Sequence, residues 1–225
     1  MRKNGSRLIS LRQYRFTDLF LFAAILVGFE LIVHYAQIAF HGEFTFSPMV
    51  AIVLLVMVRW GWESVFFAVG DGLLLCLLNM GTENFTPSHF AVYIIGNACI
   101  MLVFLLFKLV GKQKIANKWY WCVLTVIAAW LLVVLGRATV HACFGVNFAT
   151  AFVSQLFDCF SLFVGIIIIL IMRKLDGMFE DQKQYLIRKD KERKEMARRD
   201  DYGDEPIDVD EESLSILNKK DDDLY

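Results

Sequence analysis

The sequence predicts an all-α membrane protein with six transmembrane helices, and three observations lead to this fold class. First, 57% of the 225 residues are hydrophobic, and the mean hydropathy of +0.50 is typical of polytopic membrane proteins rather than soluble domains. Second, five segments reach the roughly 20 apolar residues that a helix needs to cross a bilayer, and a sixth is shorter but equally apolar. In chain order the predicted helices are residues 17–40, 46–58, 62–80, 89–110, 119–141 and 150–172.

The third observation is the alternation of basic residues along the loops. Lys and Arg occur before the first helix, between the second and third, between the fourth and fifth, and after the sixth, whereas the remaining loops carry none. Because basic loops stay on the cytoplasmic side, this alternation predicts six spans with both termini cytoplasmic. We therefore expect a multi-pass protein of the cell membrane, with the lipid bilayer as its surroundings.

Each predicted helix has its own justification. The first apolar run is too long for the hydrophobic region of a signal peptide and no small-residue cleavage site follows it, so it is expected to be retained as a span. The second is short and ends at a Trp-Gly-Trp turn, residues 60–62, from which the third begins. The third carries Asp71 near its middle, where an ionisable group is costly in lipid and must face protein or a cavity. The last three are ordinary apolar spans, and Arg173 and Lys174 follow the sixth.

Charge divides the rest of the chain. Residues 200–225 hold eleven acidic residues and two lysines, a net charge of −9, which leaves +8 for residues 1–199 because the whole chain carries −1. Residues 173–199 are rich in helix formers of both charge signs and are expected to extend the sixth helix into the cytoplasm. The predicted organisation is a basic cytoplasmic N-terminus (1–16), a six-helix transmembrane domain (17–172), a charged cytoplasmic helix (173–199) and a disordered acidic tail (200–225).

Polar side chains gather in the outer half of the predicted bundle. With the topology given above, five helices place hydrogen-bonding side chains there, while the inner half is almost entirely apolar. Because every buried polar group in a bilayer needs a partner or water, the economical arrangement is one cavity open to the outside. Any one of these residues could simply pair with a neighbouring polar side chain to hold the fold together. Their shared location in the outer half of the bundle favours a pocket. These residues are Glu30, His34, Asp71, Asn79, His89, Tyr93, Asn97, Arg137, His141, Gln155 and Asp158.

Asp71 has two interpretations at this point. Its position near mid-depth makes it either the floor of the outward pocket or an ionic partner of Arg137. A separate feature on the first helix is the pair Ala24 and Gly28, four residues apart, which lets another helix approach closely. That other helix belongs either to the same chain or to a partner.

The sequence contains no motif for an enzyme or an energy-consuming pump. There is no GxxxxGK[ST] nucleotide loop, no nucleophile elbow and no HExxH metalloprotease motif. The five cysteines are scattered singly, without a CxxC or Cys/His cluster, so neither a zinc site nor a disulfide framework is expected. We expect no enzymatic activity, no cofactor, no metal and no nucleic-acid partner. Any uphill transport would take its energy from an ion gradient or from a partner.

Several stretches together resemble the substrate-binding S components of energy-coupling factor (ECF) transporters. Residues 47–79 are similar to their second and third helices, where a short apolar helix meets a Gly-containing turn and a helix bearing Gly70-Asp71. The fourth helix, with Ile95-Gly96-Asn97, and the ending at residues 173–177 are similar as well. The resemblance implies six helices with cytoplasmic ends, a vitamin pocket in the outer halves of helices four to six, and contact of Ala24 and Gly28 with a transmembrane coupling subunit.

The resemblance implies a subunit of the bacterial plasma membrane that captures a micronutrient and works with a coupling subunit and two ATPases. It does not identify the micronutrient. Two alternatives stay open: a membrane scaffold like the MreD cell-shape proteins, and a stand-alone carrier in which Asp71 or Asp158 carries the proton. The predicted substrate-binding residues are Asp71, His89, Tyr93, Asn97, Arg137, His141, Gln155 and Asp158, and the predicted partner-binding residues are Ala24 and Gly28.

Overall fold

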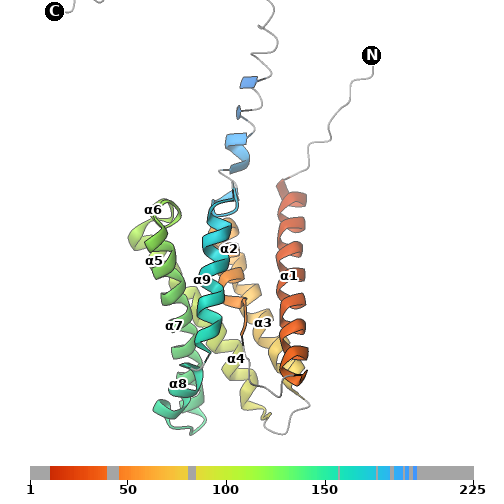
Figure 1. Cartoon of the computed structure of the whole chain (residues 1–225), viewed down its shortest axis with the longest axis vertical. Helices are drawn as coiled ribbons and strands as arrows, with labels where there is room; N and C mark the ends of the chain where they lie inside the picture. Colours follow the sequence, from red (N-terminus) through yellow and green to blue (C-terminus); the bar gives the residue numbers. More distant parts are fainter. Residues whose placement is uncertain are drawn as a thin grey trace, which may run out of the picture. The chain divides into compact units, whose positions relative to one another are not determined.

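The computed structural model of the chain describes residues 11–39, 46–80, 85–156, 158–175, 177–182, 185–189, 191–192 and 195–196, which form helices joined by short turns and include no strand (Figure 1). Contacts divide the chain into two units, Met1–Gln182 and Lys183–Tyr225. The helices of the first unit are α1 (Leu11–Ala39), α2 (Met49–Trp60), η1 (Gly61–Glu63), α3 (Ser64–Asn79), α4 (Ser88–Ala98), η2 (Cys99–Leu102), α5 (Val103–Val110), α6 (Lys112–Asn117), α7 (Trp119–Cys143), α8 (Phe148–Leu156) and α9 (Cys159–Arg173).

Within the described residues, four helical runs are long and apolar enough to cross a membrane: Arg12–Ala39, Met49–Asn79, Ser88–Val110 and Trp119–Cys143. The pair Phe148–Leu156 and Cys159–Arg173, bent by 48°, makes a fifth if it counts as one span. The chain is therefore an all-helical protein with several candidate membrane spans. The count of six, and the sidedness of the termini, stay predictions.

The run Met49–Asn79 contains both the second and the third predicted helix. Ser47, just before it, and Asn79, at its end, line the same cavity, although a straight helix of this length would separate them by about 45 Å. The chain reverses within η1, where Gly61 has a φ of +73°, a value that L-residues with a side chain rarely adopt. Neither α2, with 12 residues, nor α3, with 16, reaches the usual length of a span on its own.

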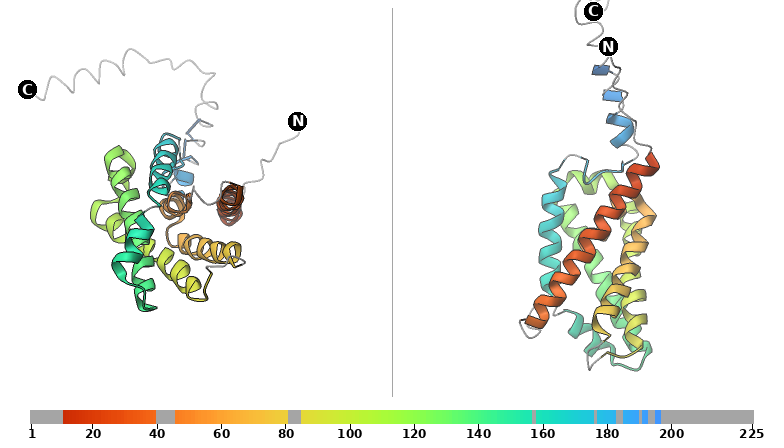
Figure 2. Two further views of the ribbon diagram at one scale, coloured as in Figure 1. Left: turned by 60° about the horizontal axis from the view of Figure 1, so that its bottom comes forward. Right: turned by 90° about the vertical axis from the view of Figure 1, so that its right-hand side faces the viewer.

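Helix α2 is the centre of the bundle. All 12 of its residues are buried, and it packs against α1, α3, α7 and α9, which surround it in the left view of Figure 2. A helix that is apolar on every side is stable only when it is enclosed in this way. The shortness that makes α2 a weak membrane span in sequence terms therefore reflects its role as the internal core element.

A buried ionic cluster holds the C-terminal end of α2. The Arg59 guanidinium donates to both carboxylate oxygens of Asp18 on α1, at 2.9 Å from Nε and 2.7 Å from Nη2, and from Nη1 to the Gly177 carbonyl at 2.8 Å. Trp60 adds a hydrogen bond from Nε1 to Asp18, at 2.6 Å. We call Asp18, Arg59, Trp60 and Gly177 the Arg59 clasp. It ties α1, α2 and the segment after α9 together, and its bidentate geometry is the strongest form of Arg–carboxylate pairing.

The segment after α9 begins with turns. Helix α9 ends at Arg173, and Gly177 has a φ of +71°. The charged cytoplasmic helix over residues 173–199 stays a prediction. In the second unit, residues 185–189 are helical, and Lys189 pairs with Glu192 three positions on, at 3.1 Å. The predicted acidic tail, residues 200–225, and most of the predicted N-terminal segment, residues 1–16, lie outside the described residues.

Candidate functional site

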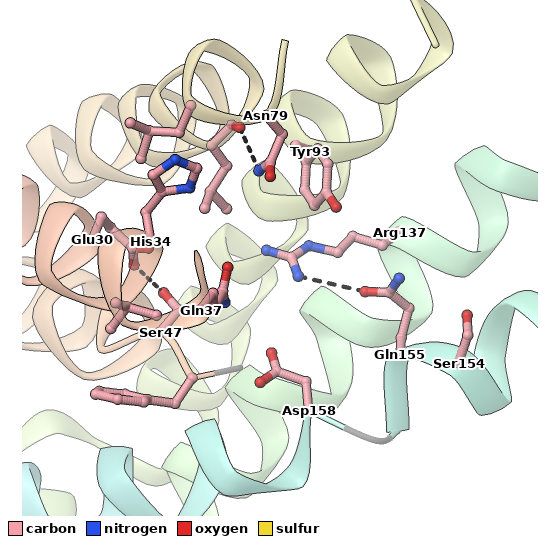
Figure 3. Close-up of a pocket in the computed structure, with 14 residues that line it drawn as sticks. Glu30, His34, Gln37, Ser47, Asn79, Tyr93, Arg137, Ser154, Gln155 and Asp158 are labelled. Carbon is pink, nitrogen blue, oxygen red and sulfur yellow. Dashed lines mark hydrogen bonds between the residues drawn. The ribbon is translucent and has the colours of Figure 1, made fainter. Parts of the chain in front are cut away.

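A cavity of about 310 Å³ opens among five helices of the first unit (Figure 3). Its walls come from the second half of α1, the segment before α2, the last turns of α3, and parts of α4, α7 and α8. Its volume is at the lower end of the range of small-molecule sites. The lining residues are Glu30, Val33, His34, Gln37, Phe46, Ser47, Leu75, Leu78, Asn79, Tyr93, Arg137, Ser154, Gln155 and Asp158.

Arg137 on α7 is the charged centre of this cavity. Its side chain is only 8% exposed and its guanidinium points into the cavity, as Figure 3 shows. Nε donates to Oδ1 of Asn97 at 2.9 Å, Nη1 donates to Oε1 of Gln155 at 3.4 Å, and the group lies over the Tyr93 ring, 5.1 Å from its centroid. Among the described residues, no carboxylate oxygen lies within 4.0 Å of its nitrogens. The structure thus holds a buried guanidinium whose described partners are neutral.

Gly96 on α4 gives Arg137 its position. A Cβ at Gly96 would lie 2.5 Å from Cγ and 2.9 Å from both Cα and N of Arg137. The reciprocal contact is equally close, since a Cβ at Gly136 would lie 2.7 Å from Sγ of Cys99. Helices α4 and α7 therefore meet backbone to backbone, which brings the Asn97 amide within reach of the Arg137 side chain.

Asp71 lies behind Arg137 rather than in the cavity wall. It is fully buried, and its Oδ2 accepts a 3.0 Å hydrogen bond from Nδ2 of Asn97, whose Oδ1 in turn accepts from Arg137. Asp71 is therefore linked to Arg137 through Asn97, and it lines a second, mostly apolar cavity of about 230 Å³ between α1 and α3. Among the described residues, no donor reaches its other oxygen, Oδ1.

Two carboxylates, Glu30 on α1 and Asp158 before α9, line the cavity from other sides. Glu30 is 2% exposed and accepts a hydrogen bond from the Ser47 hydroxyl, and Asp158 accepts one from the Ser161 hydroxyl. The Ser47 amide donates to Oγ of Ser161 at 2.8 Å, so the two acids belong to one polar network around the start of α2. In the described part of the chain, neither carboxylate has a cation within ion-pairing distance.

Family models, curated proteins and solved structures give no match to this chain. The site therefore has to be interpreted from its own geometry. Among the described residues there is no group of three His, Cys, Asp or Glu side chains placed to hold a metal ion.

The structure brings half of the predicted substrate-binding residues onto the cavity wall. Tyr93, Arg137, Gln155 and Asp158 line it directly. Asn97 and Asp71 lie behind the wall, connected to it through Arg137.

The two predicted histidines are not among the lining residues. The rings of His89 and His141 lie 5.8 Å apart, edge to face, and His89 also stacks on Tyr93 at 6.0 Å. Nδ1 of His89 lies within hydrogen-bonding distance of the Thr86 amide and hydroxyl, at 3.0 and 2.8 Å. These contacts join the first turn of α4 to the segment before it and to the end of α7, next to the cavity wall at Tyr93.

The predicted substrate-binding residues include none from α1, although Glu30 and His34 belong to the polar cluster that predicted the pocket. Glu30 and His34 share a helix face, four residues apart, and that spacing was the signal available for them. Gln37 continues the same face, and Ser47, Asn79 and Ser154 complete the polar lining. The rotation of α1 about its axis, which sends this face inward, is set by packing that no single sequence displays.

Proposed function

We propose that this protein is the substrate-capturing membrane subunit of an ECF-type importer. In this proposal it binds a vitamin or related micronutrient in the cavity around Arg137, opens that cavity to the outside, and has both termini in the cytoplasm of a bacterium. The single observation that supports it best is the buried Arg137 guanidinium, which points into a cavity and has no carboxylate partner among the described residues. Burying an unpaired charge is costly, so such a group is retained where a ligand compensates it.

The proposed cycle divides the work between subunits. The protein captures its ligand, then associates with a transmembrane coupling subunit and two ATPases, which supply the energy for inward release. This division fits a chain whose sequence has no nucleotide-binding motif. The cavity wall is built from several helices, so a change in how these helices sit in the bilayer would change access to the ligand.

A cavity-filling substitution tests capture directly. Leu78 on α3 lines the cavity. Its neighbour Leu77 is not a lining residue and is 62% exposed on the surface of the bundle. Leu78→Trp should abolish the small-molecule adduct of the protein purified from bacterial membranes, because the indole occupies the cavity. Leu77→Trp, the matched control, should keep it. Native mass spectrometry followed by denaturing release identifies the adduct.

The same experiment distinguishes substrate capture from a scaffold function. A scaffold of the MreD type needs no pocket, so wild-type protein and both tryptophan variants would carry no adduct. That result would overturn substrate capture.

The transmembrane coupling subunit is expected to contact the face of α1 that carries Ala24 and Gly28. Ala24 is exposed, and a Cβ built on Gly28 would meet no atom within 4 Å. Ala24 is thus exposed and half-buried Gly28 has open space beside it among the described residues, which favours a partner helix over packing within the chain.

Gly28→Leu should therefore reduce co-purification of the coupling subunit and ATPases by about tenfold, since a bulky side chain at a close helix contact costs roughly 1–3 kcal/mol. The matched control is Ala39→Leu, an exposed position at the end of the same helix. Quantitative mass spectrometry of the purified complex measures the effect. Equal recovery of the ATPases with both variants would remove α1 from the interface.

A second candidate function, a stand-alone ion-coupled carrier, is favoured by Asp71. Its Oδ1 is buried without a donor among the described residues, and the group that interacts with Asp71 from α1 is another carboxyl, that of Glu30. Such an arrangement is suited to holding a proton. Liposomes that contain the purified protein alone distinguish the two functions: a carrier accumulates the released adduct under a pH gradient, whereas an importer subunit without its ATPases does not.

A further inference from the structure

We propose that the ligand of the Arg137 cavity is amphoteric: a small molecule whose acidic group binds Arg137 and whose cationic nitrogen binds Glu30 and Asp158. This inference rests on the proposed function and adds the chemical class of the substrate. It follows from the charges that line the cavity and from their separation within it.

The surroundings of Arg137 indicate that the ligand carries an acidic group. Two of the three guanidinium nitrogens already donate to neutral side-chain oxygens, Nε to Asn97 and Nη1 to Gln155. These bonds, with the Tyr93 ring beneath, fix the orientation of the group in the cavity. They leave it without a carboxylate at ion-pairing distance, and no hydrogen bond from Nη2 is found among the described residues. A planar guanidinium held in this way is the preferred partner of a carboxylate or phosphate.

The carboxylates of Glu30 and Asp158 indicate that the ligand also carries a cationic nitrogen. Glu30 and Asp158 line the same cavity. Glu30 accepts a hydrogen bond from the Ser47 hydroxyl and also interacts with the Asp71 carboxyl, and Asp158 accepts a hydrogen bond from the Ser161 hydroxyl. Hydroxyl donors orient these carboxylates without neutralising them. A protonated amine or other cationic nitrogen would pair with them, and Glu30, which is 2% exposed, has little access to water in its place.

The separation of the charges is the decisive point. If the two acids and Arg137 were meant only for each other, an ion pair would stabilise the empty protein, as it does between Arg59 and Asp18 at 2.7 Å. Instead, cavity space lies between them, with Arg137 on α7, Glu30 on α1 and Asp158 at the junction of α8 and α9 (Figure 3). A ligand bearing both charge signs completes both interactions at once, which a neutral or singly charged molecule does not.

The neutral lining residues fit the same class of ligand. His34, Gln37, Asn79 and Ser154 add polar groups to the lining, and Phe46 and Leu75 provide apolar surface. The ligand is therefore expected to carry polar substituents or ring nitrogens between its acidic and basic ends.

The probe for the test is the low-molecular-weight metabolite fraction of a bacterial extract. Purified protein in nanodiscs is incubated with this fraction and re-isolated by gel filtration, and the retained molecules are identified by mass spectrometry, with the Leu78→Trp protein as the blank. We expect a retained molecule that carries both an acidic group and a basic nitrogen. Blocking its acid as an ester, or its nitrogen as an amide, should each lower binding to wild-type protein by about tenfold or more.

Isosteric variants assign the ends of the molecule to residues. Glu30→Gln and Asp158→Asn should each lower retention about tenfold or more, because each removes a charge-assisted bond to the nitrogen. Glu63→Gln is the matched control: it removes a carboxylate that pairs with Arg15 near the start of α1, away from the cavity. It should leave retention unchanged.

The retention experiment can contradict either the amphoteric ligand or substrate capture as a whole, and the two results differ. A retained molecule that is neutral or bears one charge sign overturns this inference while substrate capture stands. Retention of nothing above the Leu78→Trp blank overturns substrate capture itself. The blocked derivatives are tested on the wild-type protein, so the result does not depend on how well the variants fold.

Discussion

Replacing Asp18 by asparagine should lower the free energy of unfolding by about 3–5 kcal/mol, because it leaves the Arg59 charge buried without its partner. The side chain of Arg59 is 4% exposed and that of Asp18 is 11% exposed, so water cannot replace the lost bonds. The asparagine would keep the shape of the side chain and lose the charge that balances the guanidinium. Thermal or denaturant unfolding of the purified protein in detergent measures the change.

The chain supplies a matched control for the Asp18 variant. Arg15 pairs with Glu63 at 3.1 Å near the same end of α1, but the two side chains are 45% and 24% exposed. Arg15→Gln should therefore cost less than about 1 kcal/mol. Similar losses in both variants would show that the Arg59 clasp is no more important for stability than a surface ion pair.

The second large effect is expected at Gly96. An alanine Cβ there would lie 2.5–2.9 Å from Arg137, and two of the three nearest atoms belong to the backbone of α7 and cannot rotate away. Helices α4 and α7 must then separate, with a loss of about 1–3 kcal/mol in the free energy of unfolding. Because Asn97 and Arg137 move apart with them, ligand binding should fall as well.

Gly70→Ala is the control for the Gly96 variant. A Cβ at Gly70 would meet no atom within 4 Å, so the alanine should be neutral or stabilising by up to about 1 kcal/mol through its higher helix propensity. Unfolding and ligand retention are measured on both variants. Unchanged binding in the Gly96 variant would mean that the tight crossing of α4 and α7 does not position Arg137.

The sequence allowed the prediction of a helical membrane protein and of a polar cluster on one side of it. Both follow from simple physics, since long apolar runs need lipid or a large core and isolated polar groups within them need each other. Arg137, Gln155 and Asp158 were predictable for this reason. His89 shares a stripe with Tyr93, but it lies at the first turn of α4, where its ring contacts Thr86 and His141 instead of the cavity.

The remaining features depend on packing that no local pattern encodes. Asp18 has nothing around it in the sequence that indicates a bond to Arg59, 41 positions away. Helix α2 looks like a deficient span, and only its enclosure by four helices explains its composition. Glu30 is separated from the other cavity residues along the chain, and the rotation of α1 decides whether it faces lipid or ligand.

The position of α2 also affects the charge balance of the cavity. Its first turn begins beside Ser47, whose hydroxyl donates to Glu30 and accepts the Met49 amide at 3.2 Å. The aligned peptide dipoles of a helix place roughly half a positive charge at its N-terminus. Glu30 and Asp158, joined to this terminus through serines, are partly compensated by the backbone even before a ligand arrives. The central helix thus stabilises the acidic wall of the empty cavity and leaves the remaining compensation to the molecule that fills it.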